Sequence, residues 1–314
     1  MTTTTPVGPG SSVRPGKRAE RRFPTIGWVG LAIVGTFVGI AVTAPWIAPY
    51  PPEALSASGM ESPSGRHLLG TTRIGQDLFS QLVMGARVSL LMAALAGVGA
   101  VGIGALVGVV AGWVGGWVDA VLMRLIDVLL AFPRLPALML LGAYVGTSLT
   151  AAATTISLLF WPGTARVVRA QVQSLRRRAH LRAAEGFGAG TLHQVRHHVA
   201  PDLTLLLVAA LVGAAGRAIM LEAGLAFLGL GDPGRTSWGA MIREARALTG
   251  IFYTDIWIWW MLPPLLAIMT VMLGMTFLGV GFERRLNPRL TRHATARHPA
   301  RPAGRRGAAP GALA

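Results

Sequence analysis

The residues of this chain best suited to chemistry lie in one basic stretch, residues 174–201. It contains four of the seven histidines, and three of them, His193, His197 and His198, have spacings that bring imidazole rings together on a helix. Imidazoles bind metal ions, but protein metal sites usually add cysteines or acids. The stretch holds no cysteine and no cluster of acids. We therefore expect these histidines to be surface residues and expect no metal site.

The rest of the chain offers little for catalysis. Its 13 acids are scattered, without an Asp-x-x-Asp or His-x-x-x-Glu cluster, which disfavours a membrane-embedded transferase needing a metal or an acid–base pair. The absence of cysteine excludes disulfides and thiol nucleophiles. No Gly-x-x-x-x-Gly-Lys-Ser/Thr phosphate loop occurs. We therefore expect no catalytic residue and no cofactor here.

Composition indicates an all-α integral membrane protein. Apolar residues make up 52% of the chain, charged residues 13%, and the mean hydropathy is +0.53. Three long runs carry no charge, residues 26–47, 88–118 and 256–282. A helix needs roughly 20 apolar residues to cross a bilayer. Further segments between these runs are less apolar but could also span the membrane, so we expect about six transmembrane helices.

The chain divides into four parts. We expect a disordered basic tail over residues 1–24, then a retained first transmembrane helix with its extracytoplasmic connector over 25–86. A five-helix core over 87–285 would contain the basic stretch as a cytoplasmic loop, and a second disordered basic tail would cover 286–314.

Two sequence features predict local geometry within the core. Pro133 and Pro136 should kink the third span, because proline removes a backbone donor. Small residues recur at every fourth position from Ala96 to Gly112, forming a ridge where another helix can approach closely. That helix could belong to the same chain or to another subunit.

The formal net charge of +16 could indicate nucleic-acid binding, but its distribution indicates membrane topology instead. Twenty of the 29 basic residues fall in three groups: five before the first span, seven from Arg166 to Arg196, and eight after the last span. Basic residues concentrate on the cytoplasmic side of membranes. We therefore expect both termini and the basic stretch in the cytoplasm, and no nucleic-acid partner.

Within the basic stretch, residues 174–187 favour a short helix that Gly188 would end. Thr191 to Gln194 has a capping-box pattern that would begin a second helix, and Pro201 suits the first turn of the next span. Two short helices with a sharp bend could fit a groove on a partner protein. The alternative is a basic hairpin held by anionic membrane lipid.

This stretch resembles the Glu-Ala-Ala loop of permeases in bacterial ABC importers, through which such subunits bind their ATPases. The matching positions are Ala183, Ala184, Gly188 and Pro201. The loop departs from the pattern at its start and its end: Arg182 replaces the leading glutamate, and Glu185 stands where a basic residue is common. The usual apolar-x-Leu-Pro ending is His198-Val-Ala-Pro201 here. The resemblance implies that residues 174–201 couple this chain to an ATPase with a compensating groove.

Further segments resemble the dipeptide/oligopeptide/nickel permease family, and its second, C-type subunit in particular. They occur in the family's order over His67 to Arg289: His67–Asp77, Gly85–Leu90, Gly115–Pro133, Glu222–Gly239 and Leu286–Arg289. The resemblance implies a type I ABC-importer permease fold in the bacterial inner membrane.

The same resemblance implies function and partners. The chain would form half of a pathway for di- or oligopeptides; nickel or a nickel chelate is the alternative substrate, and a stand-alone channel is a remote alternative. The partners would be a second homologous permease subunit, two ATP-binding subunits that hold ATP and Mg, and an extracytoplasmic solute-binding protein.

Ionisable residues inside spans mark either pairing or a pathway. Arg124 and Asp127 are three residues apart, so we predict an ion pair on one helix. Arg134 and Arg217 are candidates to line a cavity, where an arginine could hold a substrate carboxylate. Roles in packing are the alternative for both arginines.

Overall fold

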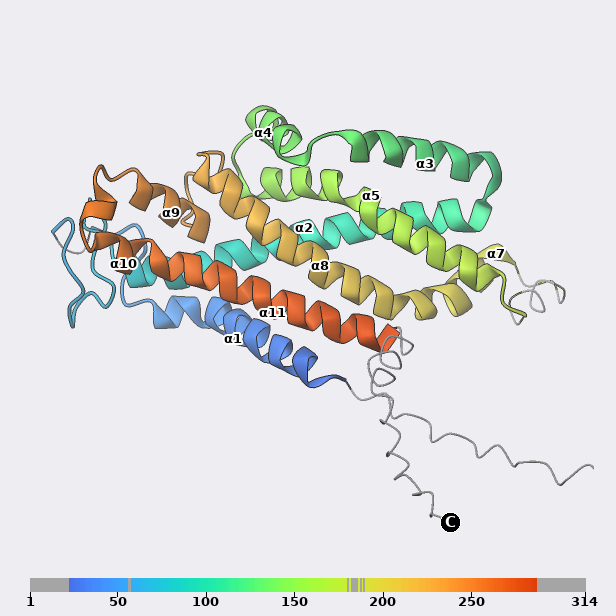
Figure 1. The fold of residues 1–314 in the computed structure, drawn as a ribbon, viewed down its shortest axis with the longest axis horizontal. Helices are drawn as coiled ribbons and strands as arrows, with labels where there is room; N and C mark the ends of the chain where they lie inside the picture. The colour runs from blue at the N-terminus through green and yellow to red at the C-terminus, as the bar shows by residue number, and fades with distance from the viewer. Residues whose placement is uncertain are drawn as a thin grey trace, which may run out of the picture.

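The computed structural model describes residues 23–55, 58–179, 181, 186, 188 and 190–286, and this part of the chain forms a long helical bundle (Figure 1). It contains isolated β-bridges but no strand. In chain order, the elements are α1 (Thr25–Ile47), α2 (Leu78–Val114), α3 (Gly116–Ala131), α4 (Arg134–Val145), α5 (Leu149–Arg176), α7 (Thr191–Gln194), a π-helix (Val195–Val199), α8 (Ala200–Phe227), α9 (Trp238–Arg246), a 3₁₀ turn (Ile251–Tyr253), α10 (Ile256–Trp260) and α11 (Leu262–Leu286). The predicted all-helical membrane fold is confirmed.

The described residues include four helical stretches long and apolar enough to cross a membrane, or five if the bent pair α3 and α4 counts as one span. The remaining long helix, α5, has 28 residues. At 1.5 Å per residue it is about 42 Å long, which exceeds the bilayer core. Its sequence is less apolar than the others because it carries threonines, serines and three arginines.

α2 begins ten residues before the charge-free run that suggested a start at Val88. Its N-terminus is set by Asp77, whose carboxylate accepts a hydrogen bond from the Ser80 backbone N–H at 2.7 Å. The expected division between residues 86 and 87 therefore lies inside α2. An uncharged run locates the apolar part of a helix and misses its polar first turns.

The small-residue ridge of α2 packs against α5 of the same chain. A methyl group added at Gly108 would lie 2.6 Å from the Ala165 carbonyl oxygen, and one at Gly104 would lie 2.7 Å from Thr164 Cβ. The sequence alone does not tell whether the approaching helix belongs to this chain or to another subunit. For this part of the ridge, it belongs to this chain. A second close crossing joins α1 to α11, where Gly30 and Gly274 face the opposing helix.

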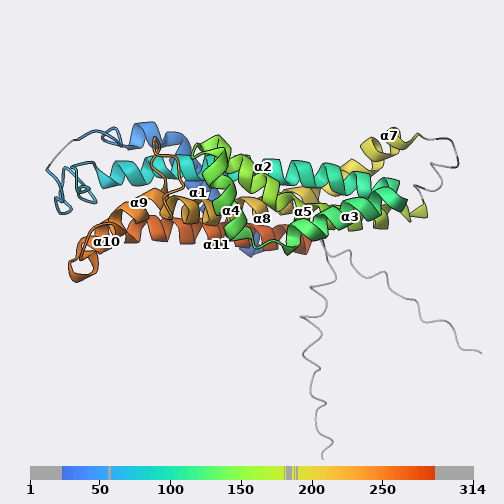
Figure 2. The ribbon, with the colours of Figure 1, turned by 90° about the horizontal axis from the view of Figure 1, so that it is seen from above.

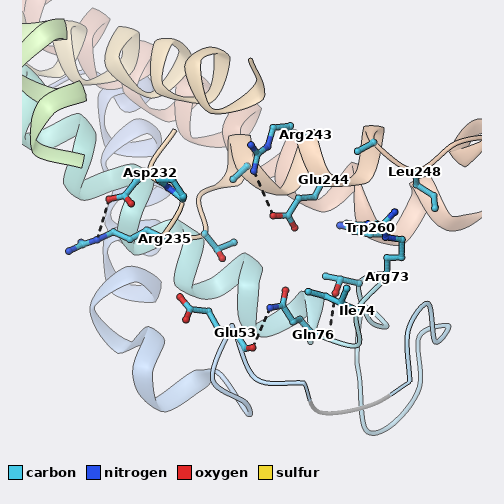
Figure 3. Close-up of a pocket in the computed structure, with 15 residues that line it drawn as sticks. Glu53, Arg73, Ile74, Gln76, Asp232, Arg235, Arg243, Glu244, Leu248 and Trp260 are labelled. Carbon is cyan, nitrogen blue, oxygen red and sulfur yellow. Dashed lines mark hydrogen bonds and ion pairs between the residues drawn. The ribbon is translucent and has the colours of Figure 1, made fainter. Parts of the chain in front are cut away.

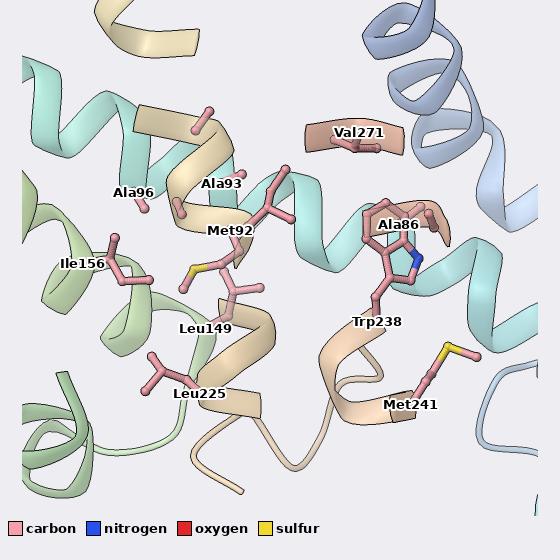
Figure 4. Packing of buried hydrophobic residues seen from close by; sticks show 14 of the residues in the cluster. Ala86, Met92, Ala93, Ala96, Leu149, Ile156, Leu225, Trp238, Met241 and Val271 are labelled. Atoms are coloured by element: carbon pink, nitrogen blue, oxygen red, sulfur yellow. The ribbon is translucent and has the colours of Figure 1, made fainter. Parts of the chain in front are cut away.

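The main core lies where α2, α5, α8, α9 and α11 meet. Met92, Leu225, Trp238 and Val271 are buried there, as Figure 4 shows. Trp238 anchors α9, since its indole N–H donates to the Leu82 carbonyl at 3.0 Å. This anchoring fixes α9 across the end of the bundle.

The third span is broken, as its prolines predict. α3 ends at Ala131, α4 begins at Arg134, and the two axes differ by 90°. Phe132 and Arg134 are exposed at the break in this single chain.

The bundle has two distinct ends. The α5–α7 region lies at one end of the bundle, which we call the loop end, and the N-terminus of α1 and the C-terminus of α11 point toward this end (Figures 1 and 2). The connector of residues 48–77 lies with α9 and α10 at the other, which we call the connector end. Of the predicted tails of residues 1–24 and 286–314, residues 1–22 and 287–314 are outside the described residues.

Candidate functional site: the loop end and the broken-helix face

Four of the six coupling residues proposed from sequence, Arg182, Ala183, Ala184 and Glu185, lie outside the described residues. The other two are described. Gly188 has a backbone φ of +81°, a conformation that favours glycine. Pro201 is the second residue of α8 and follows the π-helix directly, so its missing N–H removes one donor to the preceding turn.

The second short helix differs from the prediction. α7 begins at Thr191 with Gly190 at its N-cap, and no side chain caps it, so Thr191 does not act in a capping box. α7 also continues through the π-helix into α8, forming one helical stretch of 37 residues. A π-turn holds one residue more than an α-turn, so it absorbs an extra residue without ending the helix.

The base of the loop is attached to α8 by one apolar and one polar contact. Leu181 is 2% exposed and packs in a cluster with Val199 and Leu203. Arg178 pairs with Asp202 at 3.0 Å, with both side chains about half exposed. Leu192 on α7 is 80% exposed.

The predicted pair of Arg124 and Asp127 requires correction. Asp127 pairs with Arg166, and Asp119 forms a two-pronged pair with Arg169. Both acids belong to α3 and both arginines to α5. Spacing along one helix could not reveal these partners, because the packing of α3 on α5 brings the arginines into reach.

The two candidate cavity arginines are both exposed in this chain. The Arg134 guanidinium carbon lies over the Phe160 ring, 4.9 Å from its centroid. Arg217 lies within electrostatic range of Arg134. Among the described residues, neither arginine forms an ion pair.

The two arginines also lie at a similar level along the bundle. Phe160 comes eleven residues after the start of α5, and Arg217 comes ten residues before the end of α8. Those helix ends meet, since the Leu149 N–H donates to Asp232 at 3.2 Å, a few residues beyond α8. At 1.5 Å per residue, both positions lie about 15 Å along their helices from this meeting point.

The histidines lie at the loop end with two ring contacts. The His193 ring stacks on His197 at 4.3 Å and meets the His198 ring at 6.2 Å. No group of three histidines, acids or cysteines in the described part of the chain is placed to hold a metal ion.

Sequence reasoning missed the polar pairs of the connector end. His67 Nδ1 lies 2.8 Å from the Asp77 carboxylate, and both side chains are buried. Glu222 is also buried and accepts a hydrogen bond from the Ser89 hydroxyl at 3.2 Å. The sequence did mark most of these residues, because all of them but Ser89 fall at the ends of the motif segments. Spacing along the chain, however, does not show which motifs meet in the fold.

Two protein families match the sequence of this chain. Residues 104–292 match the family described as binding-protein-dependent transport system inner membrane component. Residues 25–64 match the N-terminal transmembrane domain of oligopeptide transport permease C.

Similar individual proteins come from several bacteria. A putative peptide permease protein of Brucella suis biovar 1 is 34% identical over 262 residues, covering 83% of this chain and 86% of the relative. The dipeptide transport system permease protein DppC of Alkalihalophilus pseudofirmus is 34% identical over 265 residues, covering 83% and 85%. With a family match over most of the core and relatives aligned along most of its length, this chain belongs to the family of binding-protein-dependent transport system inner membrane components.

Proposed function

We propose that this chain is one of two permease subunits of an ATP-driven importer of di- or oligopeptides. The alignment with relatives named as peptide and dipeptide permeases carries the proposal. A nickel importer is not favoured, because the relatives named here are peptide permeases. The chain would work with a second homologous permease, two ATP-binding subunits that hold ATP and Mg, and an extracytoplasmic solute-binding protein.

The face of the α3–α4 break is the proposed wall of the translocation pathway. Its exposed backbone needs protein or water beside it. A charge at the middle of a membrane must also face water or an opposite charge. Arg134 and Arg217 meet both requirements if this face is turned to a water-filled pathway shared with the second permease. We assign them as pathway-lining residues.

The loop of residues 174–201 is the proposed contact with the ATPase, including Arg182, Ala183, Ala184, Glu185, Gly188 and Pro201. The exposed Leu192 and the anchored Leu181 support a surface that docks on a partner and transmits its movement to α8. Because the chain lacks a phosphate-binding loop, the partner subunits must hydrolyse the ATP. The loop end, with both described termini, would face the cytoplasm.

Reconstitution tests the proposal. The complex would be purified from its native cells in mild detergent, with co-purifying proteins identified by mass spectrometry, and placed in vesicles. We expect a second permease, one or two ATPases, and uptake of labelled dialanine that requires ATP and the binding protein. Recovery of the folded chain alone, or uptake of a nickel chelate instead of dialanine, would overturn the proposal.

One variant tests the coupling loop. Arg182→Glu restores the usual residue of the resembling loops and should disturb docking on a partner adapted to arginine. Arg66→Glu makes the same charge change at an exposed position in the connector, outside this loop, and is the control. Unchanged transport-coupled ATPase activity in Arg182→Glu would count against this assignment.

A further inference from the structure

A cavity of about 300 Å³ opens at the connector end, away from the α3–α4 break and the loop (Figure 3). One wall is the connector, with Glu53, Arg73 and Gln76. The opposite wall is α9, with Arg243 and Glu244. This volume is at the lower end of the range for small-molecule pockets, so the cavity suits a small ligand or one end of a larger one.

The lining carries both charges in equal number. Three acids, Glu53, Asp232 and Glu244, accompany three arginines, Arg73, Arg235 and Arg243. A cavity with no net charge but with separated charges suits neither a simple anion nor a simple cation. It suits a ligand that carries one charge of each sign.

Most of these charges are only loosely engaged by each other. Arg243 and Glu244 approach to 4.0 Å, and Arg235 and Asp232 to 3.7 Å, both longer than a charge-assisted hydrogen bond of about 2.8 Å. Glu53 and Arg73 form no ion pair with any described residue. Asp232 is the exception, since it also accepts backbone N–H groups of Leu149 and Gly234. Arg243, Glu244, Arg73 and Glu53 therefore keep hydrogen-bonding capacity for a ligand.

Two further observations support a ligand here. Burial raises the pKa of the Glu244 carboxyl, and Arg243 only partly opposes this effect. A cationic ligand group beside Glu244 would stabilise its charged form. Trp260 also lines the cavity, is 2% exposed, and its indole N–H has no hydrogen-bond partner in the described part of the chain.

We propose that this cavity binds a small zwitterion of the amino acid or short peptide class. Arg243, with Arg73 across the opening, receives the carboxylate, and Glu244, with Glu53 across the opening, receives the ammonium group. The proposal rests on the proposed function for the choice of peptide as the ligand. It adds a site on the permease itself, at the connector end, before the pathway.

The test is equilibrium binding to the whole permease–ATPase complex in nanodiscs, without the solute-binding protein. The probes are labelled dialanine, N-acetyl-dialanine and dialanine amide. The variants are Arg243→Gln and Glu244→Gln. Arg246→Gln is the control, because Arg246 is on the same helix but lies over the Phe227 ring and does not line the cavity.

We expect saturable binding of dialanine that Arg243→Gln weakens by about tenfold, the effect of about 1.4 kcal/mol. Arg243→Gln should weaken dialanine and its N-acetyl derivative but not the amide. Glu244→Gln should weaken dialanine and its amide but not the N-acetyl derivative. The Arg246→Gln complex should bind all three probes as the unmodified complex does.

Three outcomes would overturn the inference. One is the absence of saturable dialanine binding by the unmodified complex. Another is an equal loss for all three probes in the two variants. The third is that both variants bind dialanine as the unmodified complex does but no longer capture the solute-binding protein when it is added in a separate assay. That result would make the cavity a protein-docking site. Continued ATP-driven uptake by the unmodified importer would in each case leave the proposed function standing.

Discussion

The two ends of this bundle are built in opposite ways. At the connector end, polar groups are buried and paired, as His67 with Asp77 and Glu222 with Ser89. At the loop end, the pair of Arg178 with Asp202 is about half exposed, and the helix leading into α8 contains a π-helix. Buried pairs fix one geometry because breaking them leaves an unsatisfied charge, whereas exposed pairs contribute little. The connector end is thus built to hold a shape and the loop end to receive a partner.

The largest effect should come from changing the helical register at the loop end. Deleting His197 should convert the π-helix to α-helix, rotating everything before it by about 100° relative to α8. The folded chain should remain, but most ATP-driven uptake should be lost because the loop faces the wrong direction. The measurement is vesicle uptake, with His197→Ala as the control that keeps the register. Full uptake by the deletion variant would show that the register does not matter.

Next in size is the buried pair of the connector end. Asp77→Ala removes the partner of His67 and the N-cap of α2, and we expect a loss of roughly 3 kcal/mol in the free energy of unfolding. Denaturant unfolding of the purified chain measures it. A loss below about 1 kcal/mol, the size of a single cap effect, would show that the pair does not stabilise this end.

The matching change at the loop end should be much smaller. Asp202→Ala removes the exposed partner of Arg178 and should lower the free energy of unfolding by about 1 kcal/mol or less. The same unfolding measurement applies. A loss as large as that of Asp77→Ala would remove the contrast between the two ends.

The smallest effect concerns pH at the connector end. Burial raises the pKa of Glu244 above its ordinary value of 4.5, so its stabilising contribution is complete below 4.5 and is lost as pH rises through the raised pKa. Glu244→Gln should therefore match the unmodified chain at low pH. At neutral pH it should exceed the unmodified chain by a few tenths of a kcal/mol, since the partly exposed carboxylate is screened by solvent. Thermal unfolding from pH 4 to pH 8 tests this, and a variant less stable at neutral pH would reverse the sign.

Local features of the helices were predictable where the residues of a single segment determine them. The break at Pro133 follows from proline chemistry, and Pro201 in the first turn of α8 follows from the same missing donor. The start of α2 was not predictable from hydropathy, because Asp77 and its polar neighbours define it. The helical continuity through the π-helix was not predictable either, because an extra residue in one turn leaves no hydrophobic signature.

The candidate site divides in the same way. The sequence located the loop through its glycine, proline and basic residues, and it located Arg134 and Arg217 as charges inside spans. The sequence suggested Arg124 as the partner of Asp127, because spacing along one helix reveals only neighbours on that same helix. The cavity between the connector and α9 had no sequence signal, since Glu53 and Glu244 are nearly 200 residues apart.

By itself, the sequence determined that this is an all-helical membrane chain, where its helices break, and which family it joins. These properties depend on runs of apolar residues, proline positions and ordered motifs, all of which are local. Only the tertiary structure decided that the glycine ridge of α2 packs on α5, that Arg166 pairs with Asp127, and that Arg134 and Arg217 lie near one another. Such contacts join residues far apart in the chain, so their energies depend on how the helices pack and not on neighbouring residue types.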